Sequence, residues 1–227
     1  APDSPIQNLL PEGGSLDGVF AGLAGVPGLE NAVFQASFEG DRLSLTEGSR
    51  DIVFTYTTAD GIQLEKVYRF SADSYVIGFD VRVANGSAKP LKDSLVVGLR
   101  NALDAKKSSY VFEGPAALVD KSLQQIELDD IAKKGNLSGK IKWISVEGRY
   151  FMLGLIPLKD QAAAVRMSSQ PNHVVESRYI EPEQTFGPGT QESYQYELYF
   201  GPKSMQYLKA AGHDLDVRRV ALRARFD

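Results

Sequence analysis

Residues 74–86 read SYVIGFDVRVANG, and this stretch decides the fold class. Apolar side chains fall at every second position from Tyr75 to Val83. Because successive side chains of a β-strand point to opposite faces, this period of two predicts a strand with one face on a core. Asn85-Gly86 follows at once, and this dipeptide is a signal for a tight turn.

The same period recurs on both sides of this strand. Asp60-Gly61 separates residues 52–58 from residues 62–70, which predicts a hairpin. Near the end of the chain, apolar or aromatic residues alternate from Tyr194 to Phe200. Further strands are predicted at 32–38, 94–99, 123–127, 140–146, 150–156, 162–167 and 173–179. About a dozen strands separated by turn signals, with no strand–helix–strand alternation, predict a mainly β protein built as a large antiparallel β-sandwich.

Two helices interrupt the strands. Residues 128–134 carry acids in the first turn and lysines in the last, and Gly135 follows where a helix would end, which predicts a short internal helix. Residues 202–211 start with proline and are followed by Gly212, which predicts a C-terminal helix. Its apolar stripe, spaced three residues apart, should dock on the sheet, leaving polar residues outside. The stripe is Met205, Leu208 and Ala211; the outer side is Lys203, Gln206 and Lys209, with Tyr207 at the margin.

Three segments are expected along the chain. Residues 1–30 are rich in proline and glycine, which break helices and strands, and predict a loop-like start. Residues 31–216 form a single sandwich domain that includes the C-terminal helix. Residues 217–227 form a basic tail with four arginines, which cannot begin a membrane span. We favour a tail added in cloning over an amphipathic stub.

Composition excludes several classes of protein. The 227 residues carry 25 Lys and Arg against 29 Asp and Glu, a formal net charge of −4, and 43% are hydrophobic. These are globular values, and they argue against nucleic acid as the main partner. The absence of cysteine removes disulfides, thiolate catalysis and zinc sites that need sulfur. No apolar run approaches the length that crosses a bilayer, about 18 residues, and the start at Ala1-Pro2 predicts a piece of a longer chain.

No residue pattern calls for catalysis, a cofactor or a metal. The two histidines, His173 and His213, fall at a predicted strand start and just after the C-terminal helix, where structural roles are the simpler interpretation. A Gly-x-Ser-x-Gly nucleophile motif is absent. Three pairs of carboxylates are explained by a helix start, a turn and a surface, without a metal: Asp129/Asp130, Glu181/Glu183 and Asp214/Asp216. Trp143, Tyr150, Phe151 and Leu155 are expected to share one core rather than a ligand site.

Several segments, in order, resemble one family. They are KVYRF at 66–70, SYVI at 74–77, VFEGP at 111–115, DDI at 129–131, GKIKWI at 139–144, RYF at 149–151, LIP at 155–157 and LYFGPK at 198–203. Together they are similar to the large periplasmic domain of bacterial YidC-type membrane protein insertases. The resemblance covers about residues 50–216 and implies a β-supersandwich, a fold similar to that of sugar mutarotases.

The resemblance implies a non-catalytic accessory domain on the periplasmic side of the bacterial inner membrane, tethered to the membrane in its full-length parent. The implied partners are translocon subunits, periplasmic chaperones or nascent membrane proteins. Insertase activity in that family belongs to membrane helices, so no catalytic residue carries over to this chain. Candidate partner contacts are Lys203, Gln206, Tyr207 and Lys209 on the outer side of the C-terminal helix.

Two other function classes stay open at this point. The implied fold also hosts carbohydrate-binding and mutarotase-like domains, although fold alone does not carry function. Mutarotase chemistry would need an acid and a base on either side of a sugar ring, and only His173 and His213 are available as histidine candidates. The third class is a dimerisation or scaffold module that pairs exposed strand edges between copies.

Overall fold

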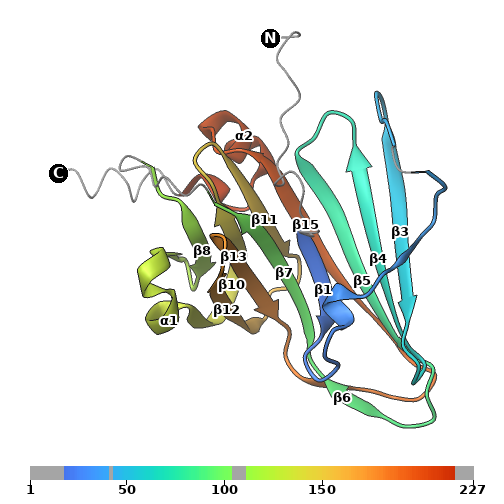
Figure 1. The fold of residues 1–227 in the computed structure, drawn as a ribbon. Helices are drawn as coiled ribbons and strands as arrows, with labels where there is room; N and C mark the ends of the chain where they lie inside the picture. The colour runs from blue at the N-terminus through green and yellow to red at the C-terminus, as the bar shows by residue number, and fades with distance from the viewer. Residues whose placement is uncertain (1–17, 41–42, 104–110, 218–227) are drawn as a thin grey trace.

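The computed structural model describes residues 18–40, 43–103 and 111–217, and it is a two-layered antiparallel β structure (Figure 1). Residues 1–17 and 218–227, and with them most of the predicted N-terminal loop and basic tail, lie outside the described residues. The fold class predicted from the alternating pattern is confirmed. The sandwich contains short helical segments, as expected.

The first layer, called layer A, is ordered β1-β7-β13-β12-β10, and every neighbouring pair is antiparallel. Its strands are β1 (Val19–Leu23), β7 (Leu95–Ala102), β13 (Val174–Ile180), β12 (Ala162–Gln170) and the first half of β10 (Asn136–Glu147).

Layer B runs from β10 through β11, β15, β5, β4 and β3 to β2, with β8 on the other edge of β10 and β9 beyond it. Its strands are β11 (Phe151–Pro157), β15 (Gln191–Pro202), β5 (Val76–Asn85), β4 (Ile62–Ser71), β3 (Ser49–Thr57), β2 (Gln35–Ala36), β8 (Gly114–Val119) and β9 (Ser122–Gln125). A separate two-stranded ribbon pairs β6 (Leu91–Asp93) with β14 (Gln184–Phe186).

Strand β10 belongs to both layers. Residues 136–140 pair with β12 in layer A, whereas residues 144–147 pair with β11 in layer B. The register with β8 shifts between Ile141 and Trp143. Such an irregularity bends a strand and lets it pass from one sheet to the other. The two layers are therefore joined at one side by a continuous strand.

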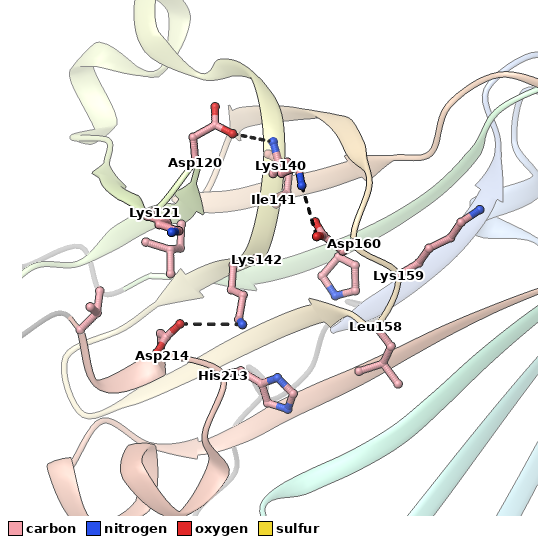
Figure 2. A pocket seen from close by; sticks show the side chains of 13 residues that line it. Asp120, Lys121, Lys140, Ile141, Lys142, Leu158, Lys159, Asp160, His213 and Asp214 are labelled. Carbon is pink, nitrogen blue, oxygen red and sulfur yellow. Dashed lines mark hydrogen bonds and ion pairs between the residues drawn. The ribbon is translucent and has the colours of Figure 1, made fainter.

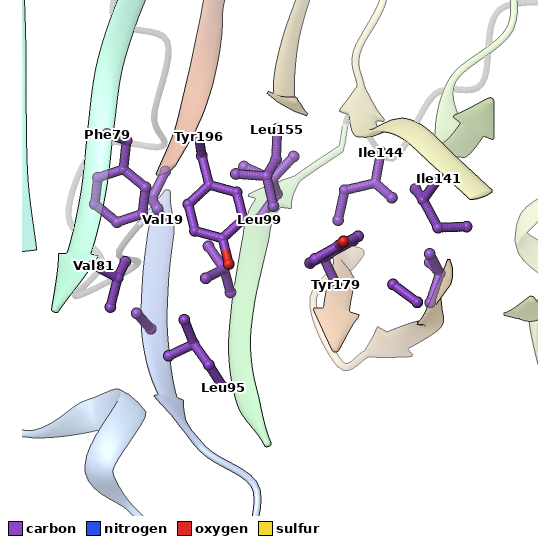
Figure 3. Close-up of a cluster of buried hydrophobic side chains, with 14 of the residues drawn as sticks. Val19, Phe79, Val81, Leu95, Leu99, Ile141, Ile144, Leu155, Tyr179 and Tyr196 are labelled. Atoms are coloured by element: carbon purple, nitrogen blue, oxygen red, sulfur yellow. The ribbon is translucent and has the colours of Figure 1, made fainter. Parts of the chain in front are cut away.

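The main core lies between the layers (Figure 3). Layer A contributes side chains such as Leu95 and Tyr179, and layer B contributes Phe79 and Tyr196, all at most 1% exposed. The rings of Tyr179 and Tyr196 meet edge to face across the layers at 6.1 Å. Burial of these inward-facing positions accounts for the period of two in the sequence.

A second, smaller core covers the outer face of layer B. Trp143, Met152 and Tyr199 lie there beneath Leu208 and Leu215. Trp143 is fully buried, but Leu155 points into the main core, so the prediction that both share one core is wrong. Tyr150, predicted to be in the core, is 70% exposed because it lies in the turn between β10 and β11.

The N-terminal segment is not all loop. Val19–Leu23 forms β1, which pairs along its whole length with β7 and is buried throughout. The alternation is lost because both faces of β1 are covered. Phe20 lies against Gly98 of β7, where a Cβ would come within 2.0 Å of the ring. The short helix η1 (Leu29–Asn31) follows.

Some of the predicted turns and helices differ in detail from those in the structure. The Asp60-Gly61 hairpin is confirmed, and Gly61 has a φ of 85°. After Asn85-Gly86 the chain bends at residues 87–89, where the Ser87 N–H donates to Asn85 Oδ1 at 3.0 Å, and the buried Asn85 amide donates to the carbonyls of Lys89 and Phe186. The predicted helix at 128–134 is a 3-10 turn, η2 (Leu128–Asp130), followed by α1 (Ile131–Lys134). The C-terminal helix α2 spans Met205–Ala211, because Pro202 still belongs to β15, and η3 (Leu215–Val217) follows.

Candidate functional site

Helix α2 packs on the outer face of layer B. Leu208 is 2% exposed and lies in the second core, with Ala211 partly buried beside it. The predicted docking of the apolar stripe is confirmed for these two residues, whereas Met205 is only half-buried. Because the inner face is anchored by packing, the outer face of α2 is held in a fixed orientation.

The outer side of α2 presents polar and aromatic groups. Gln206 and Lys209 are exposed, and Tyr207 is 39% exposed. The Tyr207 ring meets the ring of Tyr75 edge to face at 5.1 Å, and Tyr75 is itself 43% exposed. Tyr75 also lies 6.4 Å from Tyr199 of the second core. These four exposed residues, Tyr75, Gln206, Tyr207 and Lys209, are called the α2 surface below.

Lys203 does not lie on the outer side, contrary to the prediction. Its side chain is 13% exposed, and Nζ donates to the carbonyl oxygens of Phe112 at 2.7 Å and Gly148 at 2.9 Å. Nζ also lies 3.2 Å from Oε2 of the buried Glu147. The prediction failed because α2 starts two residues after Lys203, so the helical periodicity does not apply to it. Burial lowers the pKa of Lys203 to about 8.

A cleft of about 820 Å³ opens beside α2 (Figure 2). It lies between the β8–β9 turn, β10, the β11–β12 loop and the segment after α2. Apolar side chains line part of it, including Leu118, Ile141 and Leu158. The charged residues that line it are Asp120, Lys121, Lys140, Lys142, Lys159, Asp160 and Asp214.

The charges of the cleft largely pair with one another. Lys140 Nζ lies 3.2 Å from Asp160, and Lys142 Nζ lies 3.8 Å from Asp214 (Figure 2). All four side chains are more than half exposed, so these pairs contribute little stability. Among the described residues, no group of three or more His, Asp or Glu side chains could hold a metal ion.

The two histidines lie in different parts of the structure. His213 lines the cleft, but its Nε2 is 2.6 Å from Oε2 of Glu197, so the two groups bind each other. His173 lies in the turn before β13 with a φ of 58°. The His213 and Glu197 side chains are thus in direct contact, rather than on opposite sides of a space for a sugar ring.

Glu181 is a buried carboxyl group that the sequence did not reveal. Its place next to Pro182 predicts a turn, but the side chain is 4% exposed and accepts a hydrogen bond from Tyr196 Oη at 2.6 Å. Burial raises the pKa of Glu181, opposed in part by the hydrogen bond from Tyr196. Glu181 does not line the cleft, so its perturbed pKa is a feature of the core.

Comparison with known proteins decides the family. The model of the YidC periplasmic domain matches residues 2–218, nearly the whole chain. The chain belongs to the YidC periplasmic domain family. The resemblance to this family that the sequence segments indicated is thus confirmed. The two-layered fold is that of a YidC periplasmic domain.

Curated relatives of this YidC domain are named membrane protein insertase YidC. The protein from Citrifermentans bemidjiense is 31% identical over 189 residues, which is 82% of this chain and 35% of the relative. The protein from Geotalea daltonii is 30% identical over 193 residues, 83% of this chain and 36% of the relative. The chain thus spans about a third of the relatives it matches. Their name fits a role that is not enzymatic.

Solved structures show the fold alone. A galactose mutarotase related enzyme from Lactobacillus acidophilus matches with a TM-score of 0.50 and 12% identity, covering 77% of this chain and 73% of that one. A TPR-domain containing protein from Parabacteroides distasonis also gives 0.50, with 10% identity, over 80% of this chain and 37% of that one. The YidC domain therefore has the predicted mutarotase-like sandwich, and a sugar-binding function is not favoured.

None of the helices among the described residues of the YidC domain is long and apolar enough to cross a membrane.

Three of the four predicted contact residues, Gln206, Tyr207 and Lys209, are brought together on one exposed side of α2. Lys203 is separated from them by burial. Tyr75, the residue before β5, packs against Tyr207, and the spacing of residues in the sequence does not predict this contact.

Proposed function

We propose that this domain is a non-catalytic accessory part of a membrane protein insertase. It is placed on the periplasmic side of the bacterial inner membrane and is tethered there by the rest of its parent chain. The match of the YidC periplasmic domain model to residues 2–218 carries the proposal. The names of the relatives, all membrane protein insertases, support it.

The proposed contact surface is the α2 surface. Tyr75 and Tyr207 offer two exposed rings whose packing against each other limits their motion. Tyrosine is enriched at protein interfaces because it combines a large apolar area with a polar group. Gln206 and Lys209 surround the rings with polar groups, as the rim of an interface does.

The proposed partners are translocon subunits, periplasmic chaperones or nascent membrane proteins. The α2 surface is separate from the groups that hold α2 in place, since Leu208 and Lys203 point inward. A partner can therefore bind the outer side while the inner side keeps the helix fixed. This separation makes the contact residues open to substitution without loss of the fold.

The test is copurification of partners with the full-length parent insertase. Gln206→Glu with Lys209→Glu should lower the recovery of bound partners, since charges at the rim of an interface tune association. Gln63→Glu with Lys92→Glu is the matched control, because it makes the same change in net charge at two exposed residues of β4 and β6, outside the α2 surface. Unchanged partner recovery with the α2 variants, at equal levels of folded insertase, would refute the assignment of this surface.

A further inference from the structure

The outer face of layer A carries a row of basic side chains that the α2 surface does not explain. Cross-strand register places Phe20, Gly98, Arg178, Arg166 and Asn136 side by side on five adjacent strands. Paired residues in antiparallel strands point to the same face, and Val19, Leu99 and Met167, one position along, point into the main core. Arg166 and Arg178 therefore face outward.

Two further cations share this face. Arg100 lies opposite Glu176 in the next row, and Lys140, opposite Ala162, lies at the β10 side. The four cations, Arg100, Lys140, Arg166 and Arg178, are called the basic face. Glu176 is the only carboxylate at the outward positions of β1, β7, β13, β12 and residues 136–140 of β10, and it is 1% exposed. A second carboxylate, Asp160 of the β11–β12 loop, lies 3.2 Å from Lys140 Nζ, so the four cations still outnumber the two carboxylates beside them. The whole chain has a net charge of −4, so this face is opposite in sign to the molecule.

Two of the guanidinium groups are held in place by the fold. Glu176 accepts hydrogen bonds from Nε of Arg100 at 2.9 Å and from Nε of Arg178. The same two guanidinium groups lie over the ring of Phe20, at 4.7 and 5.2 Å from its centre. Phe20 can lie there because Gly98 has no side chain. A single buried carboxylate thus orients two arginines and neutralises only one charge.

The third arginine, Arg166, lies directly beside another cation, Arg178. Arg166 is exposed and is the direct cross-strand partner of Arg178. Like charges directly opposite on neighbouring strands are destabilising, so this arrangement costs stability in the free domain. An external anion between the strands would offset that cost. Guanidinium groups suit phosphate oxygens because their planar donors can bind two oxygens at once.

We propose that the basic face binds the phosphate groups of an anionic phospholipid bilayer. None of the large, exposed apolar side chains of the described residues lies on β7, β10, β12 or β13. Protein interfaces usually have an apolar centre, whereas adsorption to an anionic membrane needs only basic side chains near its surface. Basic groups on four neighbouring strands of one sheet face can meet several lipid phosphates at once.

This inference rests on the proposed function, because a domain tethered to the inner membrane stays close to a lipid surface. Layer A faces one side of the sandwich, and α2 covers the outer face of layer B on the other side (Figure 1). With layer A against the lipid, the α2 surface remains free for a protein partner. The domain would then have one orientation relative to the bilayer.

The test is co-sedimentation of the 227-residue chain with phosphatidylcholine vesicles that do or do not contain one-third phosphatidylglycerol. Binding should require phosphatidylglycerol and should be lost as ionic strength rises from about 0.1 M to about 1 M, where the Debye length falls from about 10 Å to about 3 Å. Arg166→Glu should weaken binding at least about fivefold, and Arg166→Glu with Lys140→Glu should weaken it further. Both residues are exposed, so these variants should keep the wild-type melting temperature.

Arg50→Glu with Lys209→Glu is the matched control, since it makes the same change in net charge on β3 of layer B and on α2, away from layer A. Equal loss of binding in this control would overturn the proposal, as would wild-type binding to pure phosphatidylcholine. So would binding that survives Arg166→Glu but is lost when residues 218–227 are removed. Arg166-dependent binding to polyglutamate without binding to vesicles would assign the face to an acidic protein instead. If vesicle binding fails while partner copurification still depends on the α2 surface, only this inference falls.

Discussion

Replacing Lys203 by alanine should destabilise the domain more than any other lysine substitution on or near α2. The substitution removes two hydrogen bonds from Nζ, at 2.7 and 2.9 Å, and the contact of 3.2 Å with Glu147, which is fully buried. Each hydrogen bond from a charged donor contributes about 1.5–3 kcal/mol, and removal of one partner of a buried ion pair costs about 3–5 kcal/mol. Since these values describe overlapping effects, we expect a loss of about 3–5 kcal/mol in the free energy of unfolding.

Urea unfolding followed by tryptophan fluorescence measures this loss. Trp143 is the single tryptophan and is fully buried in the second core beneath α2, so its emission reports on this region. Lys209→Ala is the control in the same helix, and it should change the free energy of unfolding by no more than about 0.5 kcal/mol. A loss below about 1 kcal/mol for Lys203→Ala would refute the reasoning, because it would show that Lys203 is not held as described.

The pH dependence gives a second test of the same lysine. Burial lowers the pKa of Lys203 to about 8 in the folded domain, partly opposed by the charge of Glu113, whereas an unfolded lysine titrates near about 10.4. Between these values the unfolded chain binds more protons, so folding stability from Lys203 rises with pH, by at most about 1.4 kcal/mol per unit. The cost of Lys203→Ala should therefore grow between pH 8 and pH 10. A cost that shrinks over this range would contradict the assigned burial.

Three further predictions concern the two cores. Trp143→Ala should lower the free energy of unfolding by about 3–5 kcal/mol, and an unchanged melting temperature would mean that the indole is not enclosed. Leu208→Asp places a carboxylate in the second core and should lower the melting temperature clearly more than Gln206→Asp on the outer side, which differential scanning calorimetry would show. For Glu181, burial raises the pKa, so the folded state holds the proton more tightly and stability falls as pH rises above about 4.3. Because glutamine does not titrate, Glu181→Gln avoids this loss of stability and should become more stable relative to the wild type from pH 4 to pH 7 in urea titrations. A decrease in its relative stability over this range would contradict the raised pKa of Glu181.

The sequence revealed strands with one buried face, which alternate, and longer apolar runs such as β7 and β11, which are buried at nearly every position. β5 and β15 alternate because inward residues such as Phe79 and Tyr196 meet the main core while their neighbours do not. β1 and β8 are buried at every position, so their sequences lack a period of two and were missed. β6 and β14 are only three residues long, which is too short for a periodic signal.

The candidate sites were less accessible from the sequence, because they depend on register and on where elements end. Helical spacing brought Gln206 and Lys209 to one side of α2, but it misplaced Lys203, which lies in the connection between β15 and α2. The basic face needs the pairing of β7, β12 and β13, which lie far apart in the chain. No local pattern places Arg100 beside Glu176, since 76 positions separate them.

Site-specific photo-crosslinking in the full-length parent insertase tests the central claim most directly. A photoreactive amino acid at Gln206 or Lys209 probes the α2 surface, and the same group at Gln63 or Lys92 probes exposed positions on β4 and β6. An accessory domain that binds partners through the α2 surface should give crosslinks to other proteins at 206 and 209 and few or none at 63 and 92. Equal crosslinking at all four positions, or crosslinks confined to 63 and 92, would contradict the account.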